Sequence, residues 1–299
     1  MKNFTFLLVF FLLLSCNKTP EVVDVIDTEF SGEKQVTIQG YDGNAMEPFI
    51  TKDDKYLFFN SEADDNGKDL YYARKIDNTT FEFLGKISGV NTEDVDANPT
   101  MDADSNFFFI STRDYDSEKG TIYMGQFANG TVTNVQKIEG DIEETSLFWL
   151  NMGVEISITG DTMFVSTAKF GIGATFPSKG DIHYAVRQDG QYNIPDDEPE
   201  ILSNINTDYA VEYAGEMSTD GLELFYSQVT LTDPPRFKLY HSKRTSTDQP
   251  FGKPTFIKVP FEDNEYAFVE APTLSADGKR LYYHKLVDGK FKIFMLSRN

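Results

Sequence analysis

The sequence predicts an all-β fold, a single β-propeller of five four-stranded blades. Three observations support this prediction: a hairpin pattern that occurs five times, an aromatic-rich strand after each turn, and a last unit that lacks one strand. The 299 residues include 26 Phe and 15 Tyr, an aromatic content that suits strands better than helices. Four short antiparallel strands per unit, repeated around an axis, are typical of a propeller.

The first fifteen residues predict a secretion signal outside the fold. Lys2 precedes an apolar run from Phe4 to Leu14, which is shorter than the about 20 residues of a membrane-spanning helix. The only cysteine, Cys16, follows Leu13, Leu14 and Ser15. This segment resembles the bacterial lipoprotein signal, in which the chain is cut before the cysteine and lipid is attached to it. The resemblance implies a mature chain that begins at Cys16 and is anchored by lipid to a membrane of the bacterial cell envelope, on its periplasmic or surface face.

The repeated unit consists of a short strand, a polar turn containing Asp, and a second apolar strand. Its five copies align with one another at Pro48, Pro99, Ile156, Gly215 and Pro272. Two copies have Asp-Gly in the turn, at Asp220 and Asp277, where glycine tolerates a positive φ. The copies are EPFITKDDKYLFFNS (47 to 61), NPTMDADSNFFFIST (98 to 112), EISITGDTMFVSTAK (155 to 169), AGEMSTDGLELFYSQ (214 to 228) and APTLSADGKRLYYHK (271 to 285).

Each unit continues with a third strand, and four units continue with a fourth. The third strands have apolar residues that tend to alternate, as a half-buried strand requires; they are KDLYYARK, GTIYMGQF, GDIHYAVR, FKLYHSKR and FKIFMLSR. The expected fourth strands are FEFLGKIS, GTVTNVQKI, EPEILSN and KPTFIKVP. The adjacent aromatic pairs of the second strands, such as Phe58-Phe59, are expected to place one ring on each face of a blade, between neighbouring blades.

The fifth unit ends at Asn299, directly after its third strand. Residues 30 to 44 are similar to residues 250 to 264, the fourth-strand region of the preceding unit. We therefore expect the N-terminal segment to supply the missing strand and close the ring, which removes an open sheet edge. The predicted organisation is a signal peptide (1–15), an acidic tether (16–29) and a propeller domain (30–299).

The consensus of Pro, Ser or Thr, Asp-Gly, an aromatic strand and a later Asp-Leu-Tyr strand resembles the TolB-like, WD-like propeller repeat. The residues that carry it are clearest in the first and fifth units, at Pro48, Thr51, Asp53 and Asp69-Leu70-Tyr71, and at Pro272, Ser275, Asp277 and Gly278. The third unit departs from the pattern. The resemblance implies a scaffold that binds proteins or polymers in the envelope, often without chemistry of its own.

Charge and motifs exclude several classes of function. The formal charge of −21 comes from 48 acidic and 27 basic side chains, and such a surface repels the phosphates of nucleic acid. His183, His241 and His284 have no zinc-site spacing, and neither a Gly-x-Ser-x-Gly elbow nor a phosphate-binding loop occurs. The stretch from Glu62 resembles a calcium loop, but Ala73 stands where a bidentate Glu is needed. We expect no metal and no cofactor.

Carboxylates stand at or near the first strand of every unit. In a propeller this strand is innermost, so the side chains would surround one mouth of the channel; solvated acidic loops are the simpler explanation. They are Glu47, Asp94, Asp96, Glu155, Glu212, Glu216, Glu265 and Glu270. EPFI at Glu47 and VEAPTL at Glu270 also resemble strand starts of five-bladed glycosidases of the arabinanase and xylosidase type. That resemblance implies that one carboxyl acts as acid and the other as base or nucleophile, although the family usually has Asp where Glu47 stands.

The sequence favours a membrane-anchored, non-catalytic binding protein that presents one propeller face to an envelope protein or a polysaccharide. The expected contacts are Trp149 and the loop at 167–181 with Phe170 and Phe176, together with Glu47, Asp96, Glu155, Glu212 and Glu270. Packing of these aromatic residues between blades is the alternative. A glycoside hydrolase that uses Glu47 and Glu270 is the alternative function.

Overall fold

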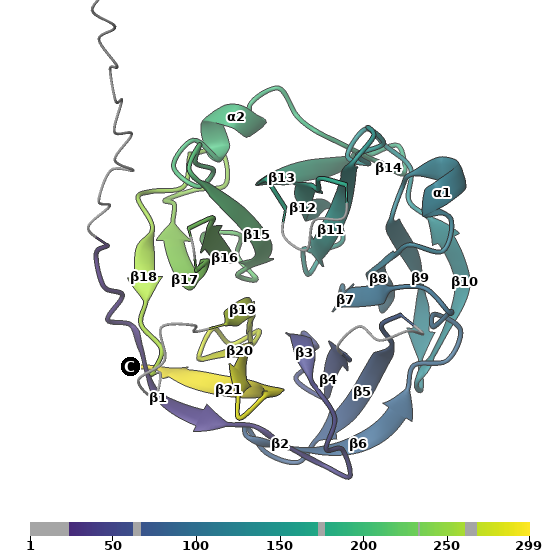
Figure 1. Ribbon diagram of the computed structural model, residues 1–299, viewed down its shortest axis with the longest axis vertical. Coiled ribbons are helices and arrows are strands. Elements are labelled where there is room, and N and C mark those ends of the chain that lie inside the picture. Colours follow the sequence, from purple (N-terminus) through teal and green to yellow (C-terminus); the bar gives the residue numbers. More distant parts are fainter. Residues whose placement is uncertain (1–23, 62–66, 173–176, 233, 261–267) are drawn as a thin grey trace, which may run out of the picture.

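The computed structural model confirms a five-bladed propeller; it describes residues 24–299 apart from 62–66, 173–176, 233 and 261–267. Five sheets surround a central axis, and each sheet has its first strand innermost (Figure 1). Blade 1 holds β3 (Met46–Ile50), β4 (Tyr56–Asn60), β5 (Leu70–Lys75) and β6 (Thr80–Lys86); blade 2 holds β7 (Asp96–Met101), β8 (Asn106–Ser111), β9 (Ile122–Ala128) and β10 (Thr131–Lys137); blade 3 holds β11 (Trp149–Ile156), β12 (Thr162–Lys169), β13 (Lys179–Gln188) and β14 (Gln191–Asn193); blade 4 holds β15 (Ala210–Met217), β16 (Glu223–Thr230), β17 (Arg236–Lys243) and β18 (Thr255–Ile257); blade 5 holds β19 (Val269–Leu274), β20 (Arg280–Val287) and β21 (Lys290–Arg298).

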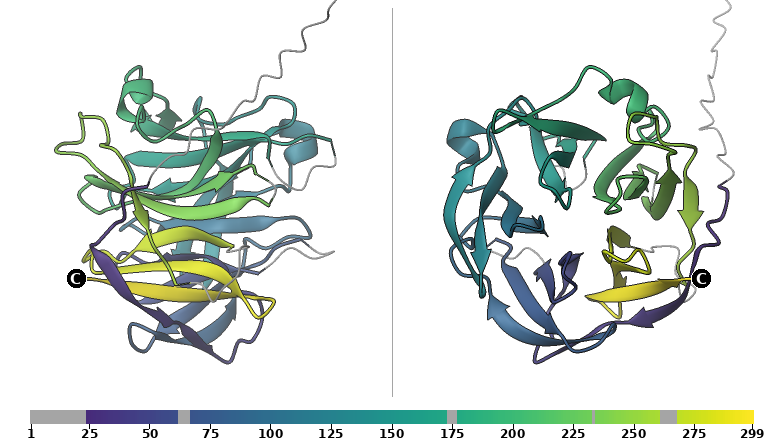
Figure 2. Two further views of the ribbon diagram at one scale, coloured as in Figure 1. Left: turned by 60° about the vertical axis from the view of Figure 1, so that its left-hand side comes forward. Right: turned by 180° about the vertical axis from the view of Figure 1, so that it is seen from behind.

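The N-terminal segment closes the ring, as the sequence predicts. Strand β1 (Phe30–Gln35) pairs antiparallel with β21 and completes blade 5. The next strand, β2 (Thr37–Gln39), pairs in parallel with β6 and adds a fifth strand to blade 1, which the sequence did not indicate. Seen from either side, this segment runs along the outside of the ring from blade 5 to blade 1 (Figure 2).

The segment before β1 lies against the outer edge of blade 4. Ile26 forms a parallel bridge with Phe256. Asp24 accepts a hydrogen bond from the Tyr240 hydroxyl at 2.7 Å, and Asp27 contacts the Nδ1 of His241 at 2.9 Å. The described part of the expected tether, residues 24 to 29, is thus bound to the propeller.

Five similar turns join the first and second strands of the blades. In each, the N–H of the fourth residue donates to the carbonyl of the first, and the fourth residue has a positive φ between 60° and 72°. The Ser275 hydroxyl accepts the N–H of Arg280 at 3.0 Å and donates to Asp277 at 2.6 Å, which explains the recurring Ser/Thr-x-Asp. The residues at the positive φ are Asp54, Ser105, Gly160, Gly221 and Gly278.

The third blade corrects two expectations. Ser157 N–H donates to Thr162 O, as Thr51 N–H donates to Tyr56 O, so Val154 rather than Ile156 is the equivalent of Pro48. The stretch EPEILSN is not a fourth strand: residues Glu198–Ile201 form the short helix α2, and β14 is the fourth strand instead. Pro199 cannot donate to a sheet ladder and suits the first turn of a helix. A second short helix, α1, spans Tyr115–Glu118 in blade 2; neither helix is long or apolar enough to cross a membrane, nor is any other among the residues described.

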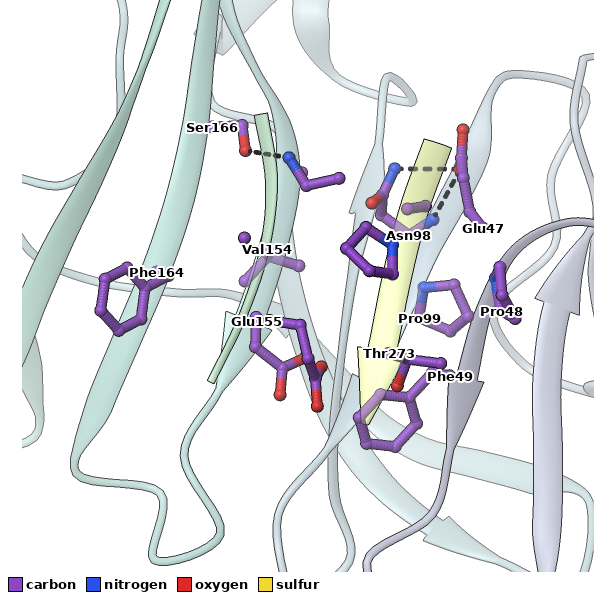
Figure 3. A pocket seen from close by; sticks show the side chains of 16 residues that line it. Glu47, Pro48, Phe49, Asn98, Pro99, Val154, Glu155, Phe164, Ser166 and Thr273 are labelled. Atoms are coloured by element: carbon purple, nitrogen blue, oxygen red, sulfur yellow. Dashed lines mark hydrogen bonds between the residues drawn. The ribbon is translucent and has the colours of Figure 1, made fainter. Parts of the chain in front are cut away.

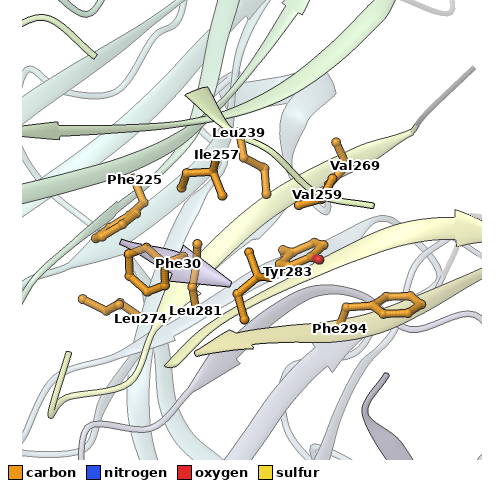
Figure 4. Close-up of a cluster of buried hydrophobic side chains, with 11 residues drawn as sticks. Phe30, Phe225, Leu239, Ile257, Val259, Val269, Leu274, Leu281, Tyr283 and Phe294 are labelled. Atoms are coloured by element: carbon orange, nitrogen blue, oxygen red, sulfur yellow. The ribbon is translucent and has the colours of Figure 1, made fainter. Parts of the chain in front are cut away.

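The aromatic pairs pack between blades as predicted. Phe58 belongs to the cluster shared with blade 2, and its neighbour Phe59 to the cluster shared with blade 5. Between blades 4 and 5, Phe30 of β1 enters the cluster, with its ring centroid 5.6 Å from that of Phe225 (Figure 4). Closure of the ring therefore also completes a buried interface.

Candidate functional site at the mouth of the central channel

A β-bulge interrupts the innermost strand of every blade. The register shifts lie between Met46 and Phe49 in β3 and at the equivalent places of β7, β15 and β19. In β11 the shift lies slightly earlier, between Asn151 and Gly153. In four blades the bulge contains a non-glycine residue at positive φ: Glu47, Asn98, Ala214 and Ala271, at 50° to 53°. The repeated proline directly follows three of these residues. Bulges redirect side chains, and these direct them at the channel.

The bulge N–H groups are bonded across the blade interfaces, and we call these contacts the inter-blade bulge bonds. In each case a side chain of the second strand of the preceding blade is the acceptor, so the freed N–H is not left unpaired. The bonds are Asn98 N–H to Asn60 Oδ1 (3.3 Å), Ala214 N–H to Ser166 Oγ (2.8 Å), Ala271 N–H to Ser227 Oγ (2.9 Å) and Glu47 N–H to His284 Nδ1 (3.1 Å).

A buried ion-paired cluster, the channel plug, crosses the channel below the bulges. Lys52 Nζ lies 3.2 Å from both Glu155 Oε1 and Glu216 Oε1, and all three side chains are at most 6% exposed. Thr100 donates to Glu155 at 2.7 Å, and the Leu274 N–H donates to Glu216 at 3.1 Å, so every blade contributes a group. Burial and the nearby Glu216 raise the pKa of Glu155 well above its usual range. The plug closes the channel with polar groups that satisfy one another.

Above the plug lies a pocket with a cavity of about 190 Å³, which we call the mouth pocket. A smaller cavity of about 30 Å³ lies between the inner strands, where Glu47 and Asn98 are hydrogen-bonded and Glu155 is close by (Figure 3). One side of the mouth pocket is polar and the rest is apolar, an arrangement typical of small-ligand sites. Its lining includes Glu47, Asn98, Met152, Phe170, Tyr213, Val229, Phe237, Phe268 and Glu270.

Glu47 is ion-paired, and both of its carboxylate oxygens accept hydrogen bonds. Lys68 Nζ donates to Glu47 Oε1 at 2.9 Å, and Asn98 Nδ2 donates to Glu47 Oε2 at the same distance. Lys68 lies in the loop before β5 of the same blade, and Asn98 lies in β7 of blade 2. The side chains of the Glu47–Lys68 pair are only 14% and 18% exposed. A cation this close favours a negatively charged carboxylate.

Glu270 lies in a different environment. Burial raises the pKa of Glu270 to about 7; the hydrogen bond from the Tyr213 hydroxyl opposes this shift, the charge of Glu47 adds to it, and Lys68 opposes it. The pocket therefore holds one ion-paired carboxylate and one carboxyl that gains and loses its proton near neutral pH. Pairs of carboxyl groups held in different states are the usual means of dividing acid and base roles.

His284 contacts both residues. It is 0% exposed, and burial, aided by the charge of Lys68, lowers its pKa to about 3. The ring is therefore neutral. Because Nδ1 accepts the Glu47 N–H, the hydrogen of the ring is on Nε2, 3.6 Å from Glu270 Oε2.

The other expected carboxylates do not lie in the mouth pocket. Glu155 belongs to the channel plug. Asp96 accepts hydrogen bonds from Thr92 and Arg113, and Glu212 accepts them from Thr207 and Gln228. Asp96 and Glu212 are buried and hold loops and neighbouring strands, and Glu265 lies outside the described residues. Among the described carboxylates of the expected ring, Glu47 and Glu270 are the two that line the mouth pocket.

Of the expected aromatic contacts, one lines the mouth pocket. Phe170 is half-buried and forms part of its apolar wall. Trp149 is half-buried at the start of β11, with Lys169 Nζ 5.8 Å from its ring centroid, and is not part of that wall. Phe176 lies outside the described residues, as does most of the calcium-like stretch from Glu62.

Sequence reasoning missed Lys52, Lys68, Asn98, Tyr213 and His284. One signal for Lys52 was available: the equivalent residues of the other turns are Ala103, Ile158, Thr219 and Ala276, so a lysine there departs from the repeat. The acceptor position offers a similar signal, since His284 stands where the other bulge bonds use Asn60, Ser166 and Ser227.

Comparisons with known proteins show the fold. No protein-family model matches the sequence, and the search of curated proteins found no match. Among solved structures, the catalytic domain of a GH62 α-L-arabinofuranosidase from Coprinopsis cinerea is similar over 92% of this chain and 98% of its own, with a TM-score of 0.56 and 12% identity. An endo-arabinase from Bacteroides thetaiotaomicron is similar over 89% of this chain and 98% of its own, with a TM-score of 0.52 and 13% identity.

A protein described as a putative TolB from Agrobacterium tumefaciens is similar over 70% of this chain and 62% of its own, with a TM-score of 0.40 and 15% identity. At these identities, likeness to solved structures establishes architecture alone. The chain is a five-bladed propeller similar in architecture to the arabinofuranosidase and the endo-arabinase.

Proposed function

We propose that the protein is a glycan-acting propeller in which the mouth pocket binds a sugar unit and hydrolyses its glycosidic bond. The observation that carries the proposal is the pair of carboxyl groups in one pocket, Glu47 ion-paired and Glu270 with a pKa raised to about 7 by burial. Glycoside hydrolysis needs one carboxylic acid and one carboxylate on either side of the scissile bond. The apolar wall of the pocket suits the face of a sugar ring.

In this proposal Glu270 is the general acid. Its proton passes to the glycosidic oxygen as the bond from that oxygen to the sugar breaks, and Glu270 becomes a carboxylate. Glu47 stabilises the positive charge that develops on the anomeric carbon of the sugar. A water molecule forms the new bond to that carbon through its oxygen, and its proton passes to Glu47. The names of two similar structures, an α-L-arabinofuranosidase and an endo-arabinase, make arabinose-containing glycans the first substrates to examine.

The test combines chromogenic glycosides, including arabinofuranosides, with a glycan array. Glu270→Gln is expected to lower kcat by about a hundredfold or more, the usual contribution of a general acid, and Glu47→Gln to lower it comparably. Glu212→Gln is the matched control, because Glu212 is also a buried inner-strand carboxyl with a pKa raised to about 7 by burial, yet lies outside the pocket. Equal activity in the wild type and Glu270→Gln would contradict the proposal.

A second candidate function is non-catalytic binding of an envelope protein or polysaccharide. The observation that favours it is the engagement of both Glu47 oxygens, by Lys68 and by Asn98, in an ion pair and a hydrogen bond that join neighbouring parts of the ring. Apolar side chains next to Phe170 are also exposed: Phe148 is 42% exposed and Ile172 is 91% exposed. Glycan binding without turnover, or capture of an envelope protein without glycan binding, would support this candidate.

We also propose that Cys16 carries lipid and anchors the protein to a membrane of the envelope. The support is the lipoprotein-like signal and the single cysteine; Cys16 lies outside the described residues. Cys16→Ser is expected to leave an unprocessed or soluble chain, measured by intact mass and membrane fractionation. Unchanged mass and unchanged membrane partition would contradict the anchor.

A further inference from the structure

His284 does more than its equivalents in the other blades. At this position of the second strand, Asn60, Ser166 and Ser227 each accept a bulge N–H of the next blade. His284 Nδ1 accepts the Glu47 N–H in the same way. A serine or an asparagine is therefore sufficient for the bulge bond, and the imidazole brings a second polar atom, Nε2, that this bond does not use.

The second atom is buried and faces Glu270. Nε2 has no hydrogen-bond partner among the described residues, and His284 is 0% exposed. Its nearest carboxylate oxygen is Glu270 Oε2 at 3.6 Å, too far for a hydrogen bond. Since Nδ1 is an acceptor, the neutral ring has its hydrogen on Nε2, and that hydrogen is directed toward the carboxyl group.

The protonation state of Glu270 determines whether Oε2 can accept a hydrogen bond from His284. The Tyr213 hydroxyl of β15 donates to Oε1, so a protonated Glu270 has its hydrogen on Oε2, opposite the Nε2–H of His284. Two hydrogens then face each other and no bond forms. Once Glu270 loses its proton, Oε2 becomes an acceptor and both donors serve the carboxylate.

Charged groups from other elements also act on Glu270. Glu47 of β3 opposes its ionisation, and Lys68, in the loop before β5, favours it. These two charges are paired with each other at 2.9 Å, so they partly cancel. The remaining donors are neutral: Tyr213 on Oε1 and His284 toward Oε2.

We propose that His284 is a positioning residue for Glu270: its Nε2–H stabilises the carboxylate that forms when Glu270 gives its proton to the leaving oxygen, while Nδ1 holds the backbone of Glu47. No proton passes to His284, which stays neutral throughout. The inference rests on the proposed acid role of Glu270, but its test measures ionisation without substrate.

The experiment follows the carboxyl group of Glu270 by ¹³C NMR in protein labelled at Glu, with the Glu270→Gln spectrum for assignment. His284→Asn keeps the bulge bond, as Asn60 does in blade 1, and removes the donor to Glu270. We expect the titration midpoint of Glu270 to rise by about one pH unit, a tenfold change in its ionisation constant, since a hydrogen bond to a charged group is lost. His284→Gln, which retains an acceptor and a longer donor arm, is expected to return the midpoint toward the wild-type value.

Tyr226→Phe is the control, because it removes a buried hydroxyl without a partner in blade 4, outside the mouth pocket; it should leave the midpoint unchanged. A midpoint that stays the same or falls in both His284 variants overturns the inference, and thermal melts establish that the variants are folded. If His284→Asn does not fold, His284→Ser replaces it, because serine accepts the same bulge N–H in blades 3 and 4 and is too short to donate to Glu270; the midpoint must then rise in His284→Ser.

Failure of the proposed function is distinguishable from failure of this inference. A raised midpoint in His284→Asn without glycoside turnover by the wild type would support the role of His284 and reject hydrolysis. Turnover that depends on Glu270, with a midpoint that His284 does not influence, would do the reverse. With an active enzyme, the alkaline limb of the kcat/KM profile should move upward with the midpoint.

Discussion

Glu212 and Glu270 belong to neighbouring blades; the first is fully buried and the side chain of the second is 13% exposed. Burial raises the pKa of each to about 7. Their surroundings differ. Glu212 accepts hydrogen bonds from Thr207 and Gln228 and lies outside the mouth pocket, whereas Glu270 faces the pocket and a donor it does not yet bind. A raised pKa alone therefore does not identify a functional group. Glu270 is the candidate because its carboxyl group also lines the mouth pocket.

The burial of Glu212 should appear in the pH dependence of stability. Its native pKa lies above the ordinary value of 4.5, so the folded state binds the proton more tightly, and this residue lowers stability as pH rises from about 4.5 through 7, by up to roughly 3 kcal/mol. Glu212→Gln cannot titrate. We expect urea unfolding to show the variant gaining stability relative to the wild type between pH 4.5 and 8.

The prediction is wrong if the difference in free energy of unfolding between Glu212→Gln and the wild type is the same at about pH 4.5 and at about pH 8. Glu82→Gln is a suitable reference, because Glu82 is 44% exposed and paired with Arg74 at the surface. Exposed pairs contribute little, so that variant should follow the wild type at every pH.

The two carboxylates of the candidate site could be predicted from the sequence, but their partners could not. Glu47 directly precedes Pro48, and Glu270 stands two residues before Pro272, both at strand starts; this is a local pattern. His284, Tyr213 and Lys68 reach the pocket from other blades or from a loop, and no spacing along the chain specifies such contacts. The plug residue Lys52 is visible only as a departure from the repeat, and its two partners are separated from it by more than a hundred positions.

At the scale of elements, the inter-blade bulge bonds connect each inner strand to the preceding blade. Ser227→Ala is expected to lower the free energy of unfolding by about 1 to 3 kcal/mol, because the Ala271 N–H stays buried without an acceptor. Chemical denaturation measures the loss. Ser203→Ala, at an exposed position, is the control and should stay within about 0.5 kcal/mol of the wild type. Equal stability of the two variants would contradict a role for these bonds.

Most of the strands were predictable from the sequence, because turn residues followed by an aromatic-rich strand indicate a hairpin. The exception is blade 3, whose repeat has neither the inner-strand proline nor the Asp-Gly turn. Without these markers the sequence alignment is displaced by two residues, although the spacing from Ser157 to Thr162 is the same as in blades 1, 4 and 5. The stretch that begins at Glu198-Pro199 was predicted to be a strand, but it forms a helical turn. A helix of one turn is too short to show a helical period of apolar residues in the sequence.

For the whole molecule, closure by the N-terminal segment should dominate stability. Phe30 is 6% exposed within the interface of blades 4 and 5, so Phe30→Ala is expected to cost about 3 to 5 kcal/mol. A chain that begins at residue 45 should melt at a much lower temperature than one that begins at residue 24, because it also loses both N-terminal strands. Calorimetry measures both effects.

Phe148→Ala is the control for the point variant, since Phe148 is 42% exposed. If the chain that begins at residue 45 has the same melting temperature as the chain that begins at residue 24, β1 does not contribute to closure. If only Phe30→Ala is neutral, the strand pairing rather than the buried ring closes the propeller.

The pairing of β1 with β21 also determines an order in time. Strand β2 joins β6 within the same stretch of chain, but Ser31 contacts Asn299 across 268 residues. At synthesis rates of about 5 to 20 residues per second, β1 waits tens of seconds for its partner. Blade 1 can assemble early with β2 at its edge, whereas the last seam forms only after the whole ring has been made. Non-local pairing of this kind slows folding, so the closing seam is expected to be the slowest step of refolding and the interval in which a sheet edge is open to other chains.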